Sequence, residues 1–235
     1  FNPQTEKFNG FPVGTEKKLD RTNLWNIAFD PFGSVWMGSS SKGLLKYDNN
    51  TLLKSYSSSK DNPNSITIGW ANNIRESASG KIAFSTGGQF STGGFNELDP
   101  ETGQVLSISI QDIAPRIWGI NTLYEAAPGE YIINTFNKTY RLWPATNRKE
   151  QIELPGLLPN SIVNHFFTDS KGTLWLGASS GLYRQAKNSR NFERYDLSKL
   201  PGCNLTSNEV IGITESRLNG LWLRTNAGLF FYSYA

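Results

Sequence analysis

Ser179 stands in the pattern Gly177-Ala178-Ser179-Ser180-Gly181, which matches the G-x-S-x-G sequence of a hydrolase nucleophile elbow. In such an elbow a strand leads into a strained turn and then a helix, and a His and an acid activate the serine. Here Leu182-Tyr183-Arg184 follows, a short run typical of another strand. We therefore interpret Ser179 as part of a loop between two strands.

The sequence contains few residues that could bind a metal or form a disulfide. The 235 residues include one histidine, His165, and one cysteine, Cys203, too few for a Cys/His zinc site or an internal disulfide. The net charge is +3, and the Lys and Arg residues are scattered, without the basic stripe that nucleic-acid binding requires. No apolar stretch approaches the roughly 18 residues of a membrane span. We expect no metal, cofactor, nucleic-acid partner or membrane-inserted segment.

A set of aromatic and amide side chains is better suited to binding. Three tryptophans stand at the start of successive apolar runs, and amide or imidazole side chains stand in the same runs. Aromatic faces can stack on sugar rings, while Asn and His supply hydrogen bonds. The candidate ligand-binding residues are Trp25, Trp70, Trp118, Asn72, Asn121, Asn164 and His165. The alternative is that these rings plug a channel or pack under loops, because Trp is highly buried on average.

A repeat along the chain positions these residues. The segments DPFGSVWMG, from residue 30, and DSKGTLWLG, from residue 169, align with each other and with GLWLRT, from residue 220. The turn glycines Gly33, Gly80, Gly129, Gly172 and Gly220 recur every 43 to 49 residues. This is the period of a four-stranded propeller blade. The complete repeats contain short apolar runs separated by Gly, Ser, Asn and Asp, which predicts antiparallel strands and almost no helix.

Several residues have predicted places within the repeat. Trp36, Trp175 and Trp222 share one register and are expected to fill the space between blades, with Ala83 and Ile132 at or near the equivalent positions. Asp30 and Asp169 are expected to accept hydrogen bonds from turn backbone. The glycine-rich segment 87–94 is interpreted as a long loop between the second and third strands of repeat two, bordering a ligand site.

The pattern of Asp, Gly, Trp and apolar residues in the repeat resembles the two-component regulator propeller repeat. Its clearest copy is carried by Val163, Phe166, Asp169, Gly172, Leu174, Trp175, Gly177, Gly181 and Leu182. A second copy is carried by Leu24, Ile27, Asp30, Gly33, Val35, Trp36, Gly38, Gly43 and Leu44. The resemblance implies an extracytoplasmic sensor region of a bacterial signalling protein, often a hybrid histidine kinase. It also implies propellers that are usually seven-bladed and often paired.

We expect one all-β domain, a β-propeller of four-stranded antiparallel blades with five blade repeats. The blades are predicted at 21–66, 67–115, 116–158, 159–206 and, incomplete, 207–235. Residues 1–20 carry an orphan outer strand, Thr5 to Phe11. This strand either closes the fifth blade or marks the chain as a segment of a larger, seven-bladed propeller.

The expected function is non-catalytic ligand sensing in the periplasm. The resemblance implies a small-molecule or oligosaccharide ligand, and a second propeller, a receptor subunit or a second copy of the chain as the packing partner. Two alternatives stay open. One is a propeller lyase or glycosidase using Glu76, Glu125 and Glu209, which would need carboxylates about 5–9.5 Å apart. The other is a protein-interaction scaffold, which predicts a large flat apolar patch in place of a deep pocket.

Overall fold

The structure of the protein is a computed structural model. It describes Thr5, Lys7 and Leu197 and the ranges 23–47, 53–88, 91–114, 119–135, 138–185, 188–195 and 208–234. The predicted N-terminal orphan strand falls almost wholly outside these residues, and so does Trp118.

The described strands form five antiparallel sheets, each built from consecutive segments of the chain. Blade 1 contains β1 (Leu24–Phe29), β2 (Val35–Ser39), β3 (Leu44–Tyr47) and β4 (Leu53–Tyr56). Blade 2 contains β5 (Trp70–Glu76), β6 (Ile82–Gly88), β7 (Ser91–Leu98) and β8 (Val105–Ser109). Blade 3 contains β9 (Ile120–Ala127), β10 (Glu130–Thr135), β11 (Lys138–Trp143) and β12 (Arg148–Ile152). Blade 4 contains β13 (Val163–Thr168), β14 (Leu174–Ala178), β15 (Gly181–Gln185) and β16 (Glu193–Tyr195), and blade 5 contains β17 (Val210–Ser216), β18 (Gly220–Thr225) and β19 (Gly228–Ser233).

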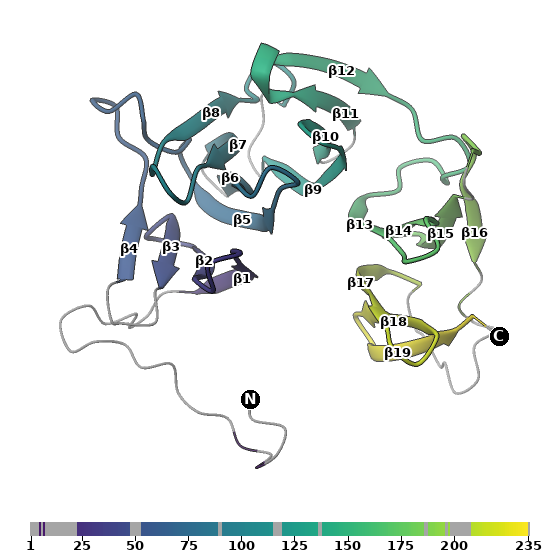
Figure 1. Ribbon diagram of the computed structural model, residues 1–235. Helices are drawn as coiled ribbons and strands as arrows, with labels where there is room; N and C mark the ends of the chain where they lie inside the picture. Colours follow the sequence, from purple (N-terminus) through teal and green to yellow (C-terminus); the bar gives the residue numbers. More distant parts are fainter. Residues whose placement is uncertain are drawn as a thin grey trace.

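The predicted all-β propeller with five blades is confirmed. Within the described part of the chain the one helical element is a 3-10 turn, η1 (Pro144–Thr146). Four sheets have four strands, and the fifth has three in the described residues. Figure 1 shows the blades arranged around a common axis, with the first strand of each blade innermost.

Two local predictions were wrong. Segment 87–94 is mostly strand, because β6 continues to Gly88 and β7 begins at Ser91. In the fifth repeat the turn residue is Asn219, not Gly220: Asn219 has φ +57°, whereas Gly220 is already the first residue of β18. Asn adopts the left-handed conformation more readily than other non-glycine residues, so it replaces the glycine of the other turns.

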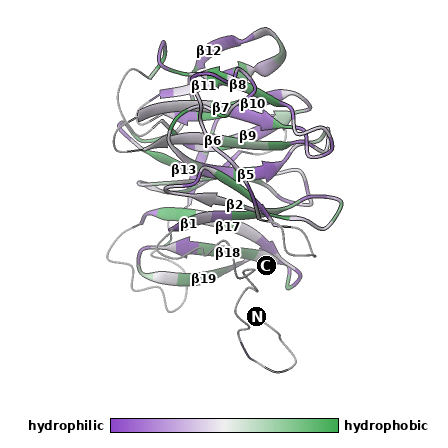
Figure 2. Cartoon of the chain, turned by 90° about the vertical axis from the view of Figure 1, so that its left-hand side faces the viewer, coloured by the Kyte–Doolittle hydropathy of each residue, from purple (hydrophilic) through white to green (hydrophobic). Residues whose placement is uncertain are grey.

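The hydrophobic core lies between the blades. Four apolar clusters fill the four interfaces, for example around Ile74 and Phe84 between blades 1 and 2 and around Leu182 and Ile213 between blades 4 and 5. The side view in Figure 2 shows apolar segments along the stacked strands. A four-stranded sheet has two faces to cover, and stacking covers them with the neighbouring sheets.

Blades 1 and 5 lie at the two ends of the arc in Figure 1. Among the described residues, no packing as extensive as that between consecutive blades joins β1 to β17. Ile27 and Phe29 of β1 are accordingly 60% and 64% exposed. Whether the ring is closed by the N-terminal strand or by further blades stays a prediction, since the residues that would decide it lie outside the described ranges.

Trp36 and Trp175 fill the space between blades as predicted. Both are buried, and each belongs to the cluster shared with the following blade. Trp222 differs: it is only partly buried, and its ring packs on Phe231 of its own blade at a centroid distance of 5.1 Å. No blade following blade 5 covers it among the described residues.

The equivalent positions in blades 2 and 3 carry smaller side chains, Ala83 and Ile132. Beside Ala83, the rings of Phe95 and Tyr131 pack at a centroid distance of 4.8 Å, and all three residues belong to the cluster between blades 2 and 3. The hydroxyl of Tyr131 donates to Glu97 at 3.0 Å. Two aromatic rings from adjacent blades therefore occupy volume that one tryptophan fills elsewhere.

Asp30 and Asp169 each organise one hairpin turn, as predicted, and also bind the tryptophan of their own repeat. Oδ1 of Asp169 accepts hydrogen bonds from the N–H groups of Lys171 and Thr173, at 3.0 and 2.8 Å. Its Oδ2 accepts from the indole N–H of Trp175 at 2.8 Å. Asp30 makes the same set of contacts with its own turn and with Trp36. The Asp and Trp of the repeat thus form one buried hydrogen-bonded unit.

The glycine at the end of the motif allows neighbouring blades to approach closely. A Cβ placed on Gly177 would lie 2.9 Å from the Val210 carbonyl oxygen and 2.9 Å from its Cγ1. Overpacking of a core contact of this kind typically costs about 1–3 kcal/mol. We expect Gly177→Ala to lower the free energy of unfolding by that amount in urea denaturation.

Gly212→Ala is the matched control. A Cβ at Gly212 would meet only the Arg224 side chain, at 3.4 Å from Nε and 3.5 Å from Cβ. A flexible surface side chain can move by a few tenths of an ångström, so the free energy of unfolding should change little. Equal losses in the two variants would contradict the close approach of blades 4 and 5.

Candidate functional site

The inner strands surround a cavity of about 740 Å³ on the axis of the arc. Six of the seven residues predicted from the sequence line it: Trp25, Trp70, Asn72, Asn121, Asn164 and His165. The seventh, Trp118, lies outside the described residues. The cavity is also lined by Gly88, from the segment 87–94 that was predicted to border a ligand site. The other lining residues were not predicted: Asn26, Asn73, Ile120, Ile162, Ile211, Gly212 and Arg224.

The two tryptophans form one aromatic platform. Trp25 of β1 and Trp70 of β5 are stacked, with ring centroids 5.8 Å apart and planes inclined by 15°. Trp70 also lies against Gly88, where a Cβ would be 2.9 Å from the indole ring. Trp70 is therefore in contact with both Trp25 and Gly88, while Trp25 is 50% exposed. Trp25 is the ring with a face available to a ligand.

Several asparagine side chains line the cavity and also join adjacent blades by hydrogen bonds. The Asn73 amide donates to the Ile120 carbonyl at 3.1 Å, and the Asn73 N–H donates to Oδ1 of Asn26 at 2.8 Å. Asn164 donates to the Val210 carbonyl at 3.1 Å. These bonds connect the innermost strands of consecutive blades. They make the wall of the cavity part of the framework.

Asn121 differs from these amides. Its side chain makes no hydrogen bond to another side chain or to the backbone within the described residues, yet it lines the cavity. A side-chain amide has two N–H donors and one carbonyl acceptor, which can form hydrogen bonds with solvent or with a ligand. Asn121 is the amide best placed to bind a ligand without disturbing a contact between blades.

His165 is neutral over the physiological pH range. Its Nδ1 accepts a hydrogen bond from the Ile213 N–H at 3.0 Å, so Nδ1 carries no proton and Nε2 is the donor. Burial, together with the positive charges of Arg75 and Arg224, lowers the pKa of His165 to about 4. The imidazole therefore offers a fixed N–H donor and no charge.

Arg224 reaches the cavity because of a reversal of residue size in blade 5. At paired positions of the inner two strands, blades 1 and 4 carry Asn26 with Gly38 and His165 with Gly177. Blade 5 instead pairs Gly212 on the inner strand with Arg224 on the next. The absence of a side chain at Gly212 leaves room for the arginine to pass inward.

Ser179 is a loop residue, as predicted. Its Oγ accepts a hydrogen bond from the Ile162 N–H at 2.9 Å, and its N–H donates to the Ile162 carbonyl at 2.8 Å. The residue joins β14 to β15 and fixes the segment that leads into blade 4. Both its hydroxyl and its backbone N–H are therefore used in hydrogen bonds that hold the loop in place.

Of the three carboxylates considered for catalysis, Glu76 is exposed at the end of β5, and the other two bind backbone and amide groups. Glu125 accepts from the N–H groups of Ala78 and Gly129, and Glu209 accepts from the side-chain amides of Asn164 and Asn226. No Asp or Glu is among the described residues that line the axial cavity. An acid and base pair of the kind glycosidases use is therefore not found in that lining.

Within the described residues, no group of three or more His, Cys, Asp and Glu side chains is arranged to hold a metal ion. A search of the same residues finds no helix long and apolar enough to cross a membrane.

Comparisons with known proteins agree with the repeat. Residues 156–180 match the family described as two component regulator propeller. The resemblance inferred from the sequence is thereby confirmed: the chain carries a repeat of this family in blade 4. No curated protein matches the chain.

Similar solved structures share the fold. One is the extracellular domain assigned to the hybrid two component system BT3049 from B. thetaiotaomicron, with a TM-score of 0.71 and 21% identity over 93% of this chain and 29% of that chain. Another is the extracellular domain assigned to the one component system BT4673 from the same organism, with a TM-score of 0.67 and 21% identity over 88% of this chain and 27% of that chain. The chain thus spans less than a third of the length of these structures.

An enzyme with a similar fold is virginiamycin B lyase from Staphylococcus aureus, with a TM-score of 0.59 and 14% identity over 90% of this chain and 70% of that chain. Because receptors and enzymes share the propeller, the fold by itself does not select a function. The site has to carry that argument.

Proposed function

We propose that this chain is a ligand-sensing part of the extracytoplasmic region of a bacterial two-component signalling receptor, located in the periplasm and without catalytic activity of its own. The observation that carries the proposal is the axial cavity, in which the Trp25 platform faces amide and imidazole donors. The repeat of the regulator propeller family and the likeness to receptor extracellular domains support it.

The chemistry of the cavity fits a saccharide. Sugar rings present C–H groups that pack on an indole face and hydroxyl groups that exchange hydrogen bonds with amides. Trp25 supplies the face, Asn121 an uncommitted amide and His165 a fixed donor. A cavity of about 740 Å³ is within the size range of small-ligand sites.

The two alternatives fit the site less well. The enzyme alternative lacks a carboxylate in the described lining of the cavity. The scaffold alternative predicts a flat apolar patch in place of a cavity, whereas the inner strands surround a cavity of about 740 Å³.

Signalling would follow from packing. A ligand shifts a conformational equilibrium only if it binds two states differently. Because the amides of the cavity wall also join adjacent blades, an occupied cavity would favour one arrangement of the blades. That arrangement would be passed to a second propeller, a receptor subunit or a second copy of the chain.

The test is a thermal-shift screen of the chain against neutral and acidic oligosaccharides. At least one saccharide is expected to raise the melting temperature, and Trp25→Ala is expected to weaken its binding by about tenfold or more, equivalent to about 1.4 kcal/mol. Because Trp25 is half exposed, the variant should keep its fold.

Phe32→Ala is the control, since Phe32 is also exposed but lies in the first hairpin turn and does not line the cavity. It should leave saccharide binding unchanged. The absence of a response to every saccharide would count against the proposed function, as would a loss of binding in Phe32→Ala as large as in Trp25→Ala.

A further inference from the structure

The axial cavity is lined by a cation without an anion. Arg224 lines it directly, and no Asp or Glu is among the described lining residues. Within the described part of the chain, Arg224 is also absent from the ion pairs that other arginines form with carboxylates. Its guanidinium therefore presents charge and several donors to the cavity.

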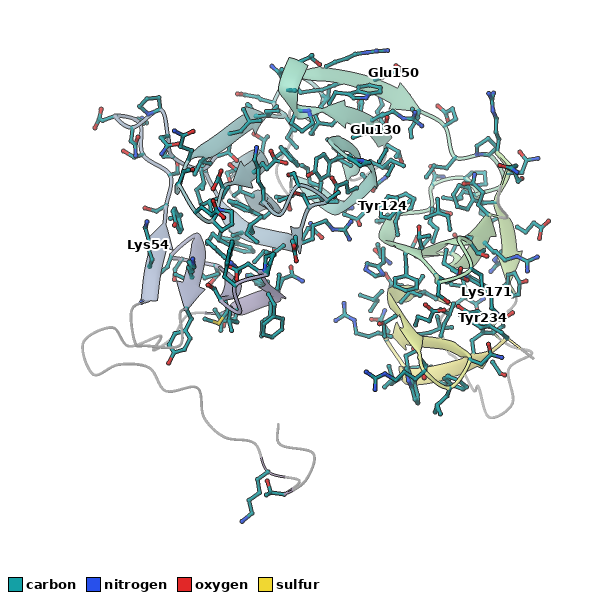
Figure 3. The ribbon with its side chains drawn as sticks, in the orientation of Figure 1. Lys54, Tyr124, Glu130, Glu150, Lys171 and Tyr234 are labelled. Carbon is teal, nitrogen blue, oxygen red and sulfur yellow. The ribbon has the colours of Figure 1, made fainter. Side chains whose placement is uncertain are left out.

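A second cation, Arg75, acts on His165 of the cavity wall. Arg75 of β5 is half-buried, and its guanidinium lies 5.6 Å from the ring centroid of Tyr124. Figure 3 shows Tyr124 on the inner side of the arc, between blades 3 and 4, where its ring stacks on Phe166. Desolvation lowers the pKa of Arg75, and the nearby Tyr124 and Glu125 only partly offset that effect.

The carboxylates near these arginines are committed to other groups. Glu125 accepts two backbone N–H groups, at 2.7 Å from Ala78 and 3.2 Å from Gly129. Glu209 accepts hydrogen bonds from two side-chain amides, those of Asn164 and Asn226. Neither forms an ion pair with Arg75 or Arg224 among the described residues. The charge of Glu125 still acts on Arg75, so Arg224 is the cation that has no carboxylate beside it in the described lining of the cavity.

Both positive charges act on His165, which lines the cavity. Burial is the largest cause of the low pKa of His165, and the positive charges of Arg75 and Arg224 lower it further. Both charges therefore interact with the imidazole. His165 is kept neutral and adds a donor but no charge. A cavity whose described lining contains a cation and no carboxylate attracts an anion.

We propose that the ligand of the axial cavity is an acidic saccharide, whose carboxylate or sulfate group binds Arg224 while a sugar ring packs on Trp25. This inference rests on the proposed function and specifies its ligand. A guanidinium matches both groups because its parallel N–H donors bind two oxygens at once. Arg75 adds a long-range attraction without touching the ligand.

Isothermal titration calorimetry of the chain tests the proposal with matched saccharides. The probes are a short oligogalacturonide, its neutral methyl ester, a chondroitin sulfate disaccharide and a neutral maltooligosaccharide. We expect a carboxylated or sulfated probe to bind about tenfold or more tightly than the neutral ones. Its affinity should fall when NaCl is raised from about 0.05 M to about 0.5 M, since salt screens charge attraction.

Variants assign the effect to Arg224. Arg224→Gln is expected to weaken binding of the acidic probe by about tenfold or more, and Arg224→Lys, which keeps the charge but not the planar fork, should retain part of the affinity. Arg217→Gln removes an equal charge from the exposed turn of the same blade and should leave binding unchanged. Circular dichroism checks that each variant is folded.

The outcomes separate this inference from the proposed function. Binding of a neutral saccharide with no gain from the charged group, or an unchanged affinity in Arg224→Gln, would overturn the acidic ligand and leave the sensing role standing. Failure of every saccharide to bind would overturn both.

Discussion

Replacing Asp169 with alanine is expected to lower the free energy of unfolding by about 3–5 kcal/mol, because several buried donors would lose a charged acceptor together. The side chain accepts from two backbone N–H groups of its turn and from the Trp175 indole. The Tyr234 hydroxyl donates to it at 3.2 Å. Trp175 is only 2% exposed, so water cannot replace the lost partner without opening the interface.

The surroundings of Asp169 explain why the loss should be large. Trp175 packs on Tyr195, Tyr232 and Tyr234, at centroid distances of 5.6 to 6.2 Å. Lys171 lies over the Tyr234 ring, 4.3 Å from its centroid, and Figure 3 shows these two residues side by side. One carboxylate therefore fixes the turn and the aromatic cluster that joins blades 4 and 5.

Urea denaturation followed by tryptophan fluorescence measures the effect, with Asp99→Ala as the control. Asp99 accepts only two backbone N–H groups, from Glu101 and Thr102, in a turn without a buried tryptophan. Its replacement should cost markedly less stability. A loss in Asp169→Ala no greater than in Asp99→Ala would contradict the unit of Asp, turn and Trp.

The same carboxylate also makes stability depend on pH. Burial alone would raise the pKa of Asp169, but hydrogen bonds from Trp175, Thr173, Tyr234 and Lys171 outweigh it, and the pKa lies below its usual value. The unfolded chain then binds this proton at a higher pH than the folded chain. The stabilisation is present above the unfolded value near 4 and is lost as the pH falls through the folded value.

Protonation of His165 in the unfolded chain is expected to lower the stability of the fold as the pH falls, in a pH range above that of Asp169. Its pKa is about 4 in the folded chain and about 6.5 when unfolded. Between these values the unfolded chain binds a proton that the folded chain does not. The free energy of unfolding should therefore fall by about 2–3 kcal/mol between pH 6.5 and pH 4.

His165→Asn tests this directly, because asparagine keeps an acceptor but does not titrate. Asn26 shows that an amide can perform the task, since its Oδ1 accepts a backbone N–H of the next blade at 2.8 Å. Urea denaturation at several pH values should show a flatter profile above pH 4 in the variant. An unchanged slope would mean that His165 is not the group responsible.

Much of this architecture follows from local chemistry that the sequence displays. The turn glycines Gly33 and Gly172 have φ of +82° and +79°, a conformation that glycine adopts without strain, so their recurrence marks the hairpins. Short apolar runs between them become strands because consecutive sheets bury both faces. The aromatic residues Trp25 and Trp70 stand apart from the repeat, which is why their place at the cavity could be predicted.

Other features depend on contacts between blades that one repeat does not encode. Asn219 takes the left-handed turn position that a glycine occupies in the other repeats. The spacing of the repeat alone does not show whether Asn219 or Gly220 is the turn residue. The segment 87–94 is rich in glycine yet continues β6 and β7, because Gly88 lies under the ring of Trp70.

Arg224 was missed because it lies in a strand that reads as structural. A signal was present: an arginine stands where blades 1 and 4 carry glycine, opposite a glycine on the inner strand. The hydrogen bonds of Asn73 and Asn164 to the next blade also could not be predicted, since they depend on how the blades stack.

The central claim, that the axial cavity binds the ligand at the Trp25 platform, is tested most directly by NMR of the tryptophan indole N–H groups. The chain has seven tryptophans, and single substitutions assign their signals. Titration with a saccharide that raises the melting temperature should shift the indole signals of Trp25 and Trp70. Those of Trp36 and Trp175, which donate to Asp30 and Asp169 inside the blade interfaces, should stay in place. Binding that leaves the Trp25 and Trp70 signals unmoved would contradict the account.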